Sequence, residues 1–136
     1  SKNAIKIAKT NAKLQQVHNR IKFINSDIDK LNHGKYDLVI TNPPYIKSNE
    51  IKNLEEDIKF YEPKISLDGG SDGLREIKKV IKKNKTLLKR KGKLVLEFDH
   101  QQKKDVIKEL KRNNFYINKV VKNYSYYDRL IIGTKL

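Results

Sequence analysis

The apolar residues at the start of the chain recur at helical spacing. Ser1 is a suitable N-cap, and the pattern behind it predicts a helix over residues 2–15. Two short apolar runs, Ile21–Asn25 and Asp37–Thr41, are then typical of strands. The second run stops abruptly at Asn42-Pro43-Pro44-Tyr45, because proline cannot continue a β-ladder.

The second half of the chain alternates helical and strand patterns. Apolar residues lie on one helical face over residues 74–88, and Gly92 is expected to end that helix. Four further elements follow: a strand over Leu94–Phe98, a helix around Val106–Leu110, and strands over Phe115–Lys122 and Leu130–Thr134. The alternation predicts an α/β fold with a largely parallel sheet, whose last two strands form an antiparallel pair at its edge.

Residues 46–72 make a long connection between the strand at Asp37–Thr41 and the next helix. A short helix is expected around Ile51–Tyr61. A connection of this length inside a compact domain is usually functional or disordered.

Composition narrows the class of protein. The 136 residues carry 31 basic and 16 acidic side chains, a net charge of +15, which suits a polyanion such as nucleic acid or the ribosome. Lysine far outnumbers arginine, however, which is typical of an AT-rich coding bias, so both explanations stay open. The absence of cysteine excludes disulfides and thiol catalysis. No apolar run approaches the length of about 18 residues that suits a membrane span, and we expect a cytoplasmic protein without membrane contact.

The run Asn42-Pro43-Pro44-Tyr45 carries the clearest chemistry. It follows a strand, and open α/β sheets bind ligands at the carboxyl ends of their strands. The Asn42 side chain and the Pro43 backbone each offer a carbonyl to the two N–H bonds of a planar amide or amine. Tyr45 adds a flat face for such a group.

Several further motifs match one family. They are Asn42-Pro43-Pro44-Tyr45-Ile46, Tyr61-Glu62-Pro63, the run Leu67–Leu74, Leu96-Glu97 with Gln101-Gln102, and Asp128–Ile132. Together they resemble the release-factor glutamine methyltransferases, the HemK/PrmC family, over essentially the whole chain. The first motif alone is shared with adenine-N6 methyltransferases of DNA and RNA.

The resemblance implies a Rossmann-like class I methyltransferase fold and S-adenosylmethionine as the cofactor. It implies N5-methylation of the glutamine in the Gly-Gly-Gln loop of peptide-chain release factors. Asn42 and Pro43 match the catalytic positions, and Pro44 and Tyr45 complete the substrate-binding motif. Asp27 and Ile28 match the positions beside the adenine of the cofactor, with Asn42 near its methyl group.

One departure from the family is large. The family begins its cofactor site with a strand, a glycine-rich turn and a second strand, whereas these residues contain no Gly-Xaa-Gly. We therefore expect residues 1–136 to be the C-terminal portion of a single methyltransferase domain, inactive alone and without useful affinity for S-adenosylmethionine. We expect the strand at Asp37–Thr41 to expose an apolar edge, and a separate chain to be one source of the missing half.

Two alternatives stay open. The first is that the chain is an adenine-N6 methyltransferase of DNA or RNA. The second is that it is an inactive remnant that acts as a basic binding module. No metal site is expected, because His18, His33 and His100 lack the spacing of metal ligands and suit surface positions.

Overall fold

The structure, a computed structural model, describes all of residues 1–136 and divides them into two compact units, Ser1–Leu31 and Asn32–Leu136. The first unit holds α1 (Lys2–Leu14) and the 3-10 helices η1 (His18–Arg20) and η2 (Ile28–Lys30). The Ala4 N–H donates to the Ser1 hydroxyl oxygen at 3.4 Å, which confirms Ser1 as the N-cap.

The strand predicted over Ile21–Asn25 is wrong. This segment forms no ladder, although Ile21 has extended backbone angles. Ile21 and Ile24 are 43% and 41% exposed, so the run lacks the packed neighbours on which strand formation depends.

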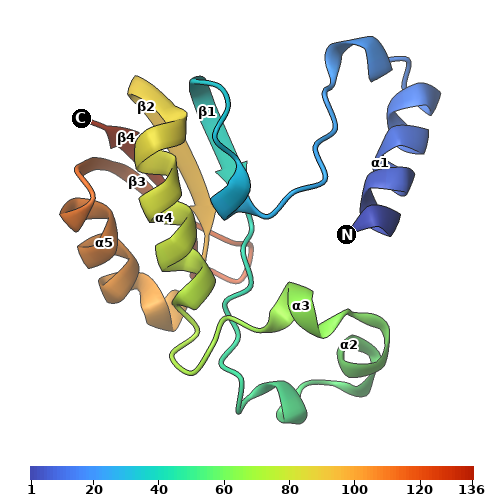
Figure 1. Cartoon of the computed structure of the whole chain (residues 1–136). Helices are drawn as coiled ribbons and strands as arrows, with labels where there is room; N and C mark the ends of the chain where they lie inside the picture. Colours follow the sequence, from blue (N-terminus) through green and yellow to red (C-terminus); the bar gives the residue numbers. More distant parts are fainter. The chain divides into compact units, whose positions relative to one another are not determined.

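The second unit is built around a four-stranded sheet (Figure 1). Its strands are β1 (Tyr36–Thr41), β2 (Leu88–Glu97), β3 (Phe115–Lys122) and β4 (Asp128–Lys135), in the order β1-β2-β4-β3. The antiparallel pairing of β3 with β4 at one edge is confirmed. The expectation of a largely parallel sheet is wrong for these residues: only β1 and β2 pair in parallel, because β4 enters between β2 and β3 and runs antiparallel to both.

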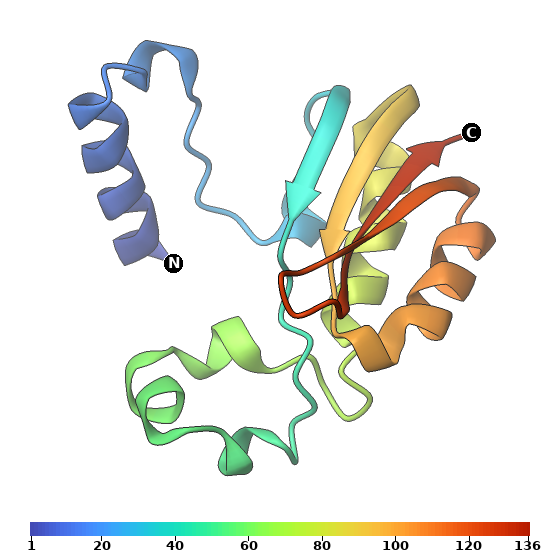
Figure 2. The same cartoon turned by 180° about the vertical axis from the view of Figure 1, so that it is seen from behind.

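Two helices, α4 (Arg75–Leu87) and α5 (Lys103–Arg112), cover one face of this sheet. Figure 2 shows the opposite face, which no helix of the second unit covers. The helices meet the middle strands in an apolar core, where Ile77 and Ile81 of α4 and Leu94 and Leu96 of β2 are fully buried. The predicted helical face over residues 74–88 is therefore the face that packs on the sheet.

Gly92 does not end a helix, contrary to the sequence-based expectation. Helix α4 ends at Leu87, and β2 begins at once and contains Gly92. The register jumps there, because Leu88 pairs with Tyr36 whereas Lys93 pairs with Leu38. A Cβ atom on Gly92 would lie 3.0 Å from the Tyr36 carbonyl oxygen, so the glycine serves a close approach of two strands at this bulge.

Strand β1 forms the other edge of the sheet. Leu38 is 49% exposed and Ile40 is 72% exposed, although both belong to an apolar run. The expected bare apolar edge is thus present in the structure, and such an edge is a template for association.

The long connection is partly helical. After the 3-10 helix η3 (Ile51–Asn53) come α2 (Glu56–Tyr61) and α3 (Lys64–Leu67), which lie beyond the end of β1 (Figures 1 and 2). We call residues 47–67 the excursion. Its two ends meet, since Ile46 and Asp68 form a parallel β-bridge. No helix of the chain has the length and apolarity that crossing a membrane requires.

Candidate active site

The four residues of the proline motif lie directly after β1 and share one cavity. Asn42, Pro43, Pro44 and Tyr45 line a hollow of about 470 Å³. The remaining lining residues come from the segment just after the motif and from the excursion: Ile46, Ile58, Glu62, Ser66 and Leu67. The structure thus brings the motif together with Glu62, which is 20 positions away from Asn42 in the sequence.

The two proposed acceptors are both free. The Asn42 side chain is exposed, and its carboxamide makes no hydrogen bond within the chain. Pro43 is buried, yet its carbonyl oxygen accepts no hydrogen bond from any backbone or side-chain donor. Both oxygens are therefore available to a hydrogen-bond donor from outside the chain.

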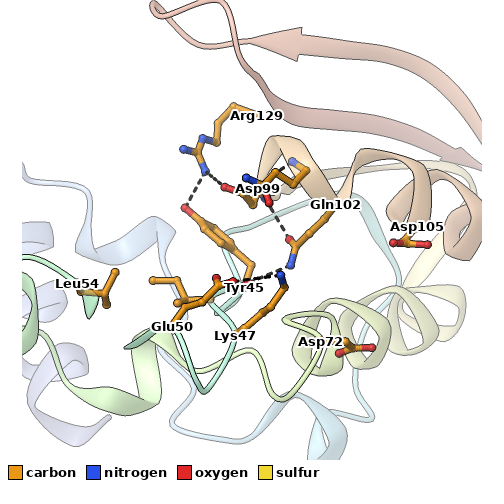
Figure 3. Close-up of a pocket in the computed structure, with 11 residues that line it drawn as sticks. Tyr45, Lys47, Glu50, Leu54, Asp72, Asp99, Gln102, Asp105 and Arg129 are labelled. Atoms are coloured by element: carbon orange, nitrogen blue, oxygen red, sulfur yellow. Dashed lines mark hydrogen bonds and ion pairs between the residues drawn. The ribbon is translucent and has the colours of Figure 1, made fainter. Parts of the chain in front are cut away.

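The Tyr45 side chain points toward Arg129, near the start of β4 (Figure 3). Its hydroxyl donates to Glu97 Oε1 at 3.0 Å and accepts from Arg129 Nη1 at 3.1 Å. The Arg129 guanidinium carbon lies 5.6 Å from the centroid of the Tyr45 ring, within the range of a cation–π contact. Two charged groups thus fix the orientation of the ring at its polar end.

The phenol of Tyr45 is held in its protonated form. Burial raises the pKa of Tyr45, and the hydrogen bond to Glu97 raises it further, whereas the positive charge of Arg129 acts in the opposite direction. A protonated phenol can keep donating to Glu97 while it accepts from Arg129.

The backbone of Tyr45 is held as firmly as its side chain. The buried amide of Gln102 donates to the carbonyl oxygens of Tyr45, at 3.0 Å, and Gly73, at 3.1 Å. Gly73 has φ of +70°, and a Cβ atom there would lie 2.5 Å from the Tyr45 oxygen. At Gly69 a Cβ atom would lie 2.8 Å from Tyr45 Cα, so both positions need glycine because the loop touches the backbone of the motif.

Asp68 closes the base of the excursion. Its Oδ1 accepts from the Ser48 hydroxyl at 2.6 Å and from the Gly70 N–H at 2.9 Å. These two hydrogen bonds stabilise the carboxylate and lower the pKa of Asp68. The Ile46 N–H also donates to the Leu67 carbonyl oxygen at 3.1 Å, so side chains and backbone together hold the two ends.

A second cavity of about 460 Å³ adjoins Tyr45 and is shown in Figure 3. Its lining combines the residues that hold Tyr45 with charged residues from several elements: Lys47, Glu50, Asp72, Asp99, Asp105 and Arg129, together with Gln101 and Gln102. Tyr45 thus forms part of the wall of both cavities.

The residues expected beside the cofactor's adenine belong to the first unit. Asp27 caps η2 by accepting from the Asp29 N–H at 3.0 Å, and Ile28 is half-buried. Asn42 lies in the second unit. The chain contains no Gly-Xaa-Gly, and Gly69 and Gly73 pack on Tyr45 instead. The residues predicted beside the cofactor thus lie in two different units, and their role in binding S-adenosylmethionine stays a prediction.

Reasoning from the sequence missed the roles of Arg129 and Gln102. Both fall in motifs that match the family, but no local pattern links them to Tyr45. Arg129 follows Tyr45 by 84 positions and Gln102 by 57, so only the fold brings them together. His18, His33 and His100 are exposed, as expected of surface residues.

Comparison with known sequences agrees with the motifs. Residues 1–66 match the model of the RMKL-like methyltransferase domain family. Over 137 aligned residues the chain is 41% identical to the release factor glutamine methyltransferase of Fusobacterium nucleatum, covering 99% of this chain and 38% of that protein. The chain spans less than half the length of the curated release factor glutamine methyltransferases that it matches.

Comparison with solved structures agrees with the fold. The ribosomal protein L11 methylase of Lactobacillus delbrueckii superimposes with a TM-score of 0.68 at 18% identity, covering all of this chain and 55% of that one. The magnesium protoporphyrin IX methyltransferase of Synechocystis, solved with bound S-adenosylmethionine, has a TM-score of 0.58 at 20% identity, covering 95% of this chain and 52% of that one. The chain has a partial Rossmann-like fold of the class I methyltransferases, and the resemblance of its sequence to the release factor glutamine methyltransferases is confirmed over nearly its whole length.

Proposed function

We propose that this chain supplies the acceptor-binding part of an S-adenosylmethionine-dependent N-methyltransferase that acts on the glutamine side chain of the Gly-Gly-Gln loop of peptide-chain release factors. The names of its relatives support this substrate. The structural support is a single observation: the Asn42 carboxamide and the Pro43 carbonyl line one cavity and are both without partners.

The chemistry of an amide explains why the site needs two hydrogen-bond acceptors. The lone pair of an amide nitrogen is delocalised into its carbonyl, so the nitrogen is a weak nucleophile. S-adenosylmethionine supplies an electrophilic methyl group. Positive charge develops on the nitrogen as it is alkylated, and carbonyl oxygens aimed at its two N–H bonds stabilise that charge. We assign these oxygens to Asn42 and Pro43. The alkylated nitrogen then loses one proton and needs no dedicated base.

Proline and tyrosine give this site its fixed geometry. Pro43 restricts Asn42 to extended backbone angles, and Pro44 restricts Pro43 in the same way, which limits the directions of both acceptors. Tyr45 is held by its hydroxyl and by its carbonyl oxygen. An orientation fixed before binding lowers the entropic cost of placing the nitrogen about 3–3.5 Å from the methyl group.

Replacement of Asn42 by alanine tests the proposal. In the complete methyltransferase that contains these residues, Asn42→Ala is expected to lower the turnover number for release-factor methylation by about 10²–10³, because one preorganised polar contact to the reacting group is lost. Asn3→Ala is a matched control, since Asn3 is exposed on α1 and distant in sequence from the motif. Mass spectrometry of the tryptic peptide that holds the target glutamine gives the rate.

The same assay, run with release factor and with nucleic acid as substrates, distinguishes methylation of glutamine from methylation of adenine. Methyl transfer to duplex DNA or to RNA, with none to release factor, would contradict the proposal and leave adenine-N6 methylation as the activity. Near-normal methylation of release factor by Asn42→Ala would contradict the role of Asn42 alone.

A further inference from the structure

The excursion has two different sides. Four of its residues face the cavity of the proline motif: Ile58, Glu62, Ser66 and Leu67. Three large apolar side chains of the same short helices are instead open to solvent. Phe60 is 74% exposed, Tyr61 is 83% exposed and Ile65 is 82% exposed. We call Phe60, Tyr61 and Ile65 the lip, because they alternate along the chain with residues that line the cavity and do not line it themselves.

The lip adds no buried side chain to the core of these residues. Neither α2 nor α3 contains a buried residue, and none of the three lip side chains belongs to the apolar core. Aromatic side chains that remain exposed side by side cost solubility, and in soluble proteins they are enriched at interaction sites.

The charge of the excursion differs from that of the remaining chain. Residues 47–67 hold four lysines and five carboxylates, a net charge of −1. The other 115 residues hold 27 basic and 11 acidic side chains, a net charge of +16. A surface that binds phosphates needs an excess of positive charge, so the segment beside the cavity is the part of the chain least suited to nucleic acid.

The two ends of the excursion are held together beside Tyr45. The Gly69 N–H donates to the Ile46 carbonyl oxygen at 2.8 Å, and the Ser48 N–H donates to the Gly70 carbonyl oxygen at 3.0 Å. These bonds fix both ends of the excursion next to Tyr45. Because Glu62 and Ser66, the sequence neighbours of lip residues, line the cavity of the proline motif, a partner bound to the lip would lie next to that cavity.

We infer that the lip is a docking surface for the folded protein that carries the target amide, and that it binds an apolar patch beside the reacting side chain. This inference rests on the proposed function and adds to it a surface that selects a protein substrate. The excursion contributes residues to the cavity of Asn42, so a molecule bound to the lip would lie next to that cavity. The near-neutral charge of the excursion favours a protein over nucleic acid as this molecule. Apolar anchors such as Phe60 and Tyr61 commonly carry much of the affinity of an interface.

The test compares two substrates, a purified bacterial release factor and a short peptide that contains its Gly-Gly-Gln sequence. The double variant Phe60→Gln with Tyr61→Gln is expected to lower the preference for release factor over peptide, as the ratio of their kcat/KM values, by about tenfold or more. Its Kd for release factor should rise by a similar factor. Tyr116→Gln with Tyr124→Gln is the matched control, because these aromatic residues are 60% and 105% exposed outside the excursion and outside the cavity. The control should keep both values.

The result that overturns the inference is a lip variant with unchanged preference and Kd, while the unaltered protein methylates release factor. In that case the proposed function stands and the docking surface is wrong. If the complete methyltransferase that contains these residues neither binds nor methylates release factor, the proposed function and the inference both fail. Ile65→Gln, a single change at an exposed position, provides a second variant if the double variant unfolds, and it should lower the preference in the same direction.

Discussion

Strands β1 and β2 lie side by side in parallel, and each runs toward the candidate site, yet their surroundings are opposite. Leu88, Leu94 and Leu96 of β2 are fully buried, whereas Leu38 and Ile40 of β1 are about half and three-quarters exposed. The strand that leads directly into the proline motif is thus the least packed strand of the sheet. The fixed geometry of the motif must come from elsewhere.

Contacts made after β1 ends provide that geometry. Tyr45 is held by Glu97 at the end of β2, by Arg129 on β4 and by Gln102 before α5. Each of these residues belongs to the well-packed part of the unit. The site is therefore ordered through β2 and β4, and β1 serves mainly to lead the chain to it.

The largest expected effect is a difference in stability between variants of β2 and variants of β1. Leu94→Ala should lower the free energy of unfolding by about 2–5 kcal/mol, because it empties a fully buried position. Ile40→Ala on the neighbouring strand should cost less than about 1 kcal/mol, because that side chain already faces solvent. Urea unfolding of both variants measures the difference. Equal losses would show that β1 is covered in solution.

The next prediction concerns the loop that touches Tyr45. Gly73→Ala should destabilise the fold by about 2–3 kcal/mol, because alanine is strained at a φ of +70° and its Cβ would meet the Tyr45 oxygen. Gly133→Ala on β4 is the control, since its nearest contact would be an ordinary 3.5 Å and its φ is not positive. If the two variants were equally stable in urea, the loop would not anchor the motif.

A double-mutant cycle tests whether Arg129 acts through Tyr45. Arg129→Gln should lower the kcat of methyl transfer by about tenfold with little change in KM, since it loosens the ring rather than removing a substrate contact. In a Tyr45→Phe background the same change should have a smaller further effect, because the hydroxyl that Arg129 holds is gone and only the cation–π contact with the ring remains.

The matched control for that cycle is Arg90→Gln, an exposed arginine near the start of β2, at the end of the strand away from Tyr45. Its effect should be near zero in both backgrounds. Additive losses for Arg129→Gln and Tyr45→Phe would instead assign Arg129 a role that is independent of the ring.

The smallest expected effect depends on pH. The pKa of Asp68 is lowered by its hydrogen bonds to Ser48 and Gly70 in the folded state, so its ionised form stabilises the fold. This contribution is fully present above the ordinary carboxyl pKa of about 4 and is lost as the pH falls through the lowered value. Asp68→Asn should therefore flatten the dependence of the melting temperature on pH below about pH 4. Asp105→Asn, at an exposed position on α5, should leave that dependence unchanged.

The fold shows where sequence patterns succeed. The helices over Lys2–Leu14 and Arg75–Leu87 and the strands Tyr36–Thr41 and Phe115–Lys122 lie close to the predicted ranges. Each has a strong apolar period or a sharp boundary signal. Ile21–Asn25 failed because its apolar residues found no ladder, and strand formation depends on partners that a local pattern does not reveal.

The site shows the same limit. The proline motif was recognisable because its four residues are consecutive and chemically unusual. Arg129 contacts it because β4 pairs with β2, and Gln102 contacts it from the short 3-10 helix His100–Gln102 that follows β2. Gly92 was misassigned for a similar reason, since its need for a small side chain comes from Tyr36 on the neighbouring strand.

Because Ile46 and Asp68 pair with each other, the two ends of the excursion are adjacent, and the segment between them can be exchanged as a unit. A segment whose ends adjoin can be exchanged for one of another length at a modest entropic cost, since closure entropy rises only slowly with length. The helices within it add no buried residue to the core. Transplanting residues 49–66 from a relative with a different substrate would thus leave the proline motif and the residues that hold Tyr45 in place, while it would exchange the side chains that this segment contributes to the cavity.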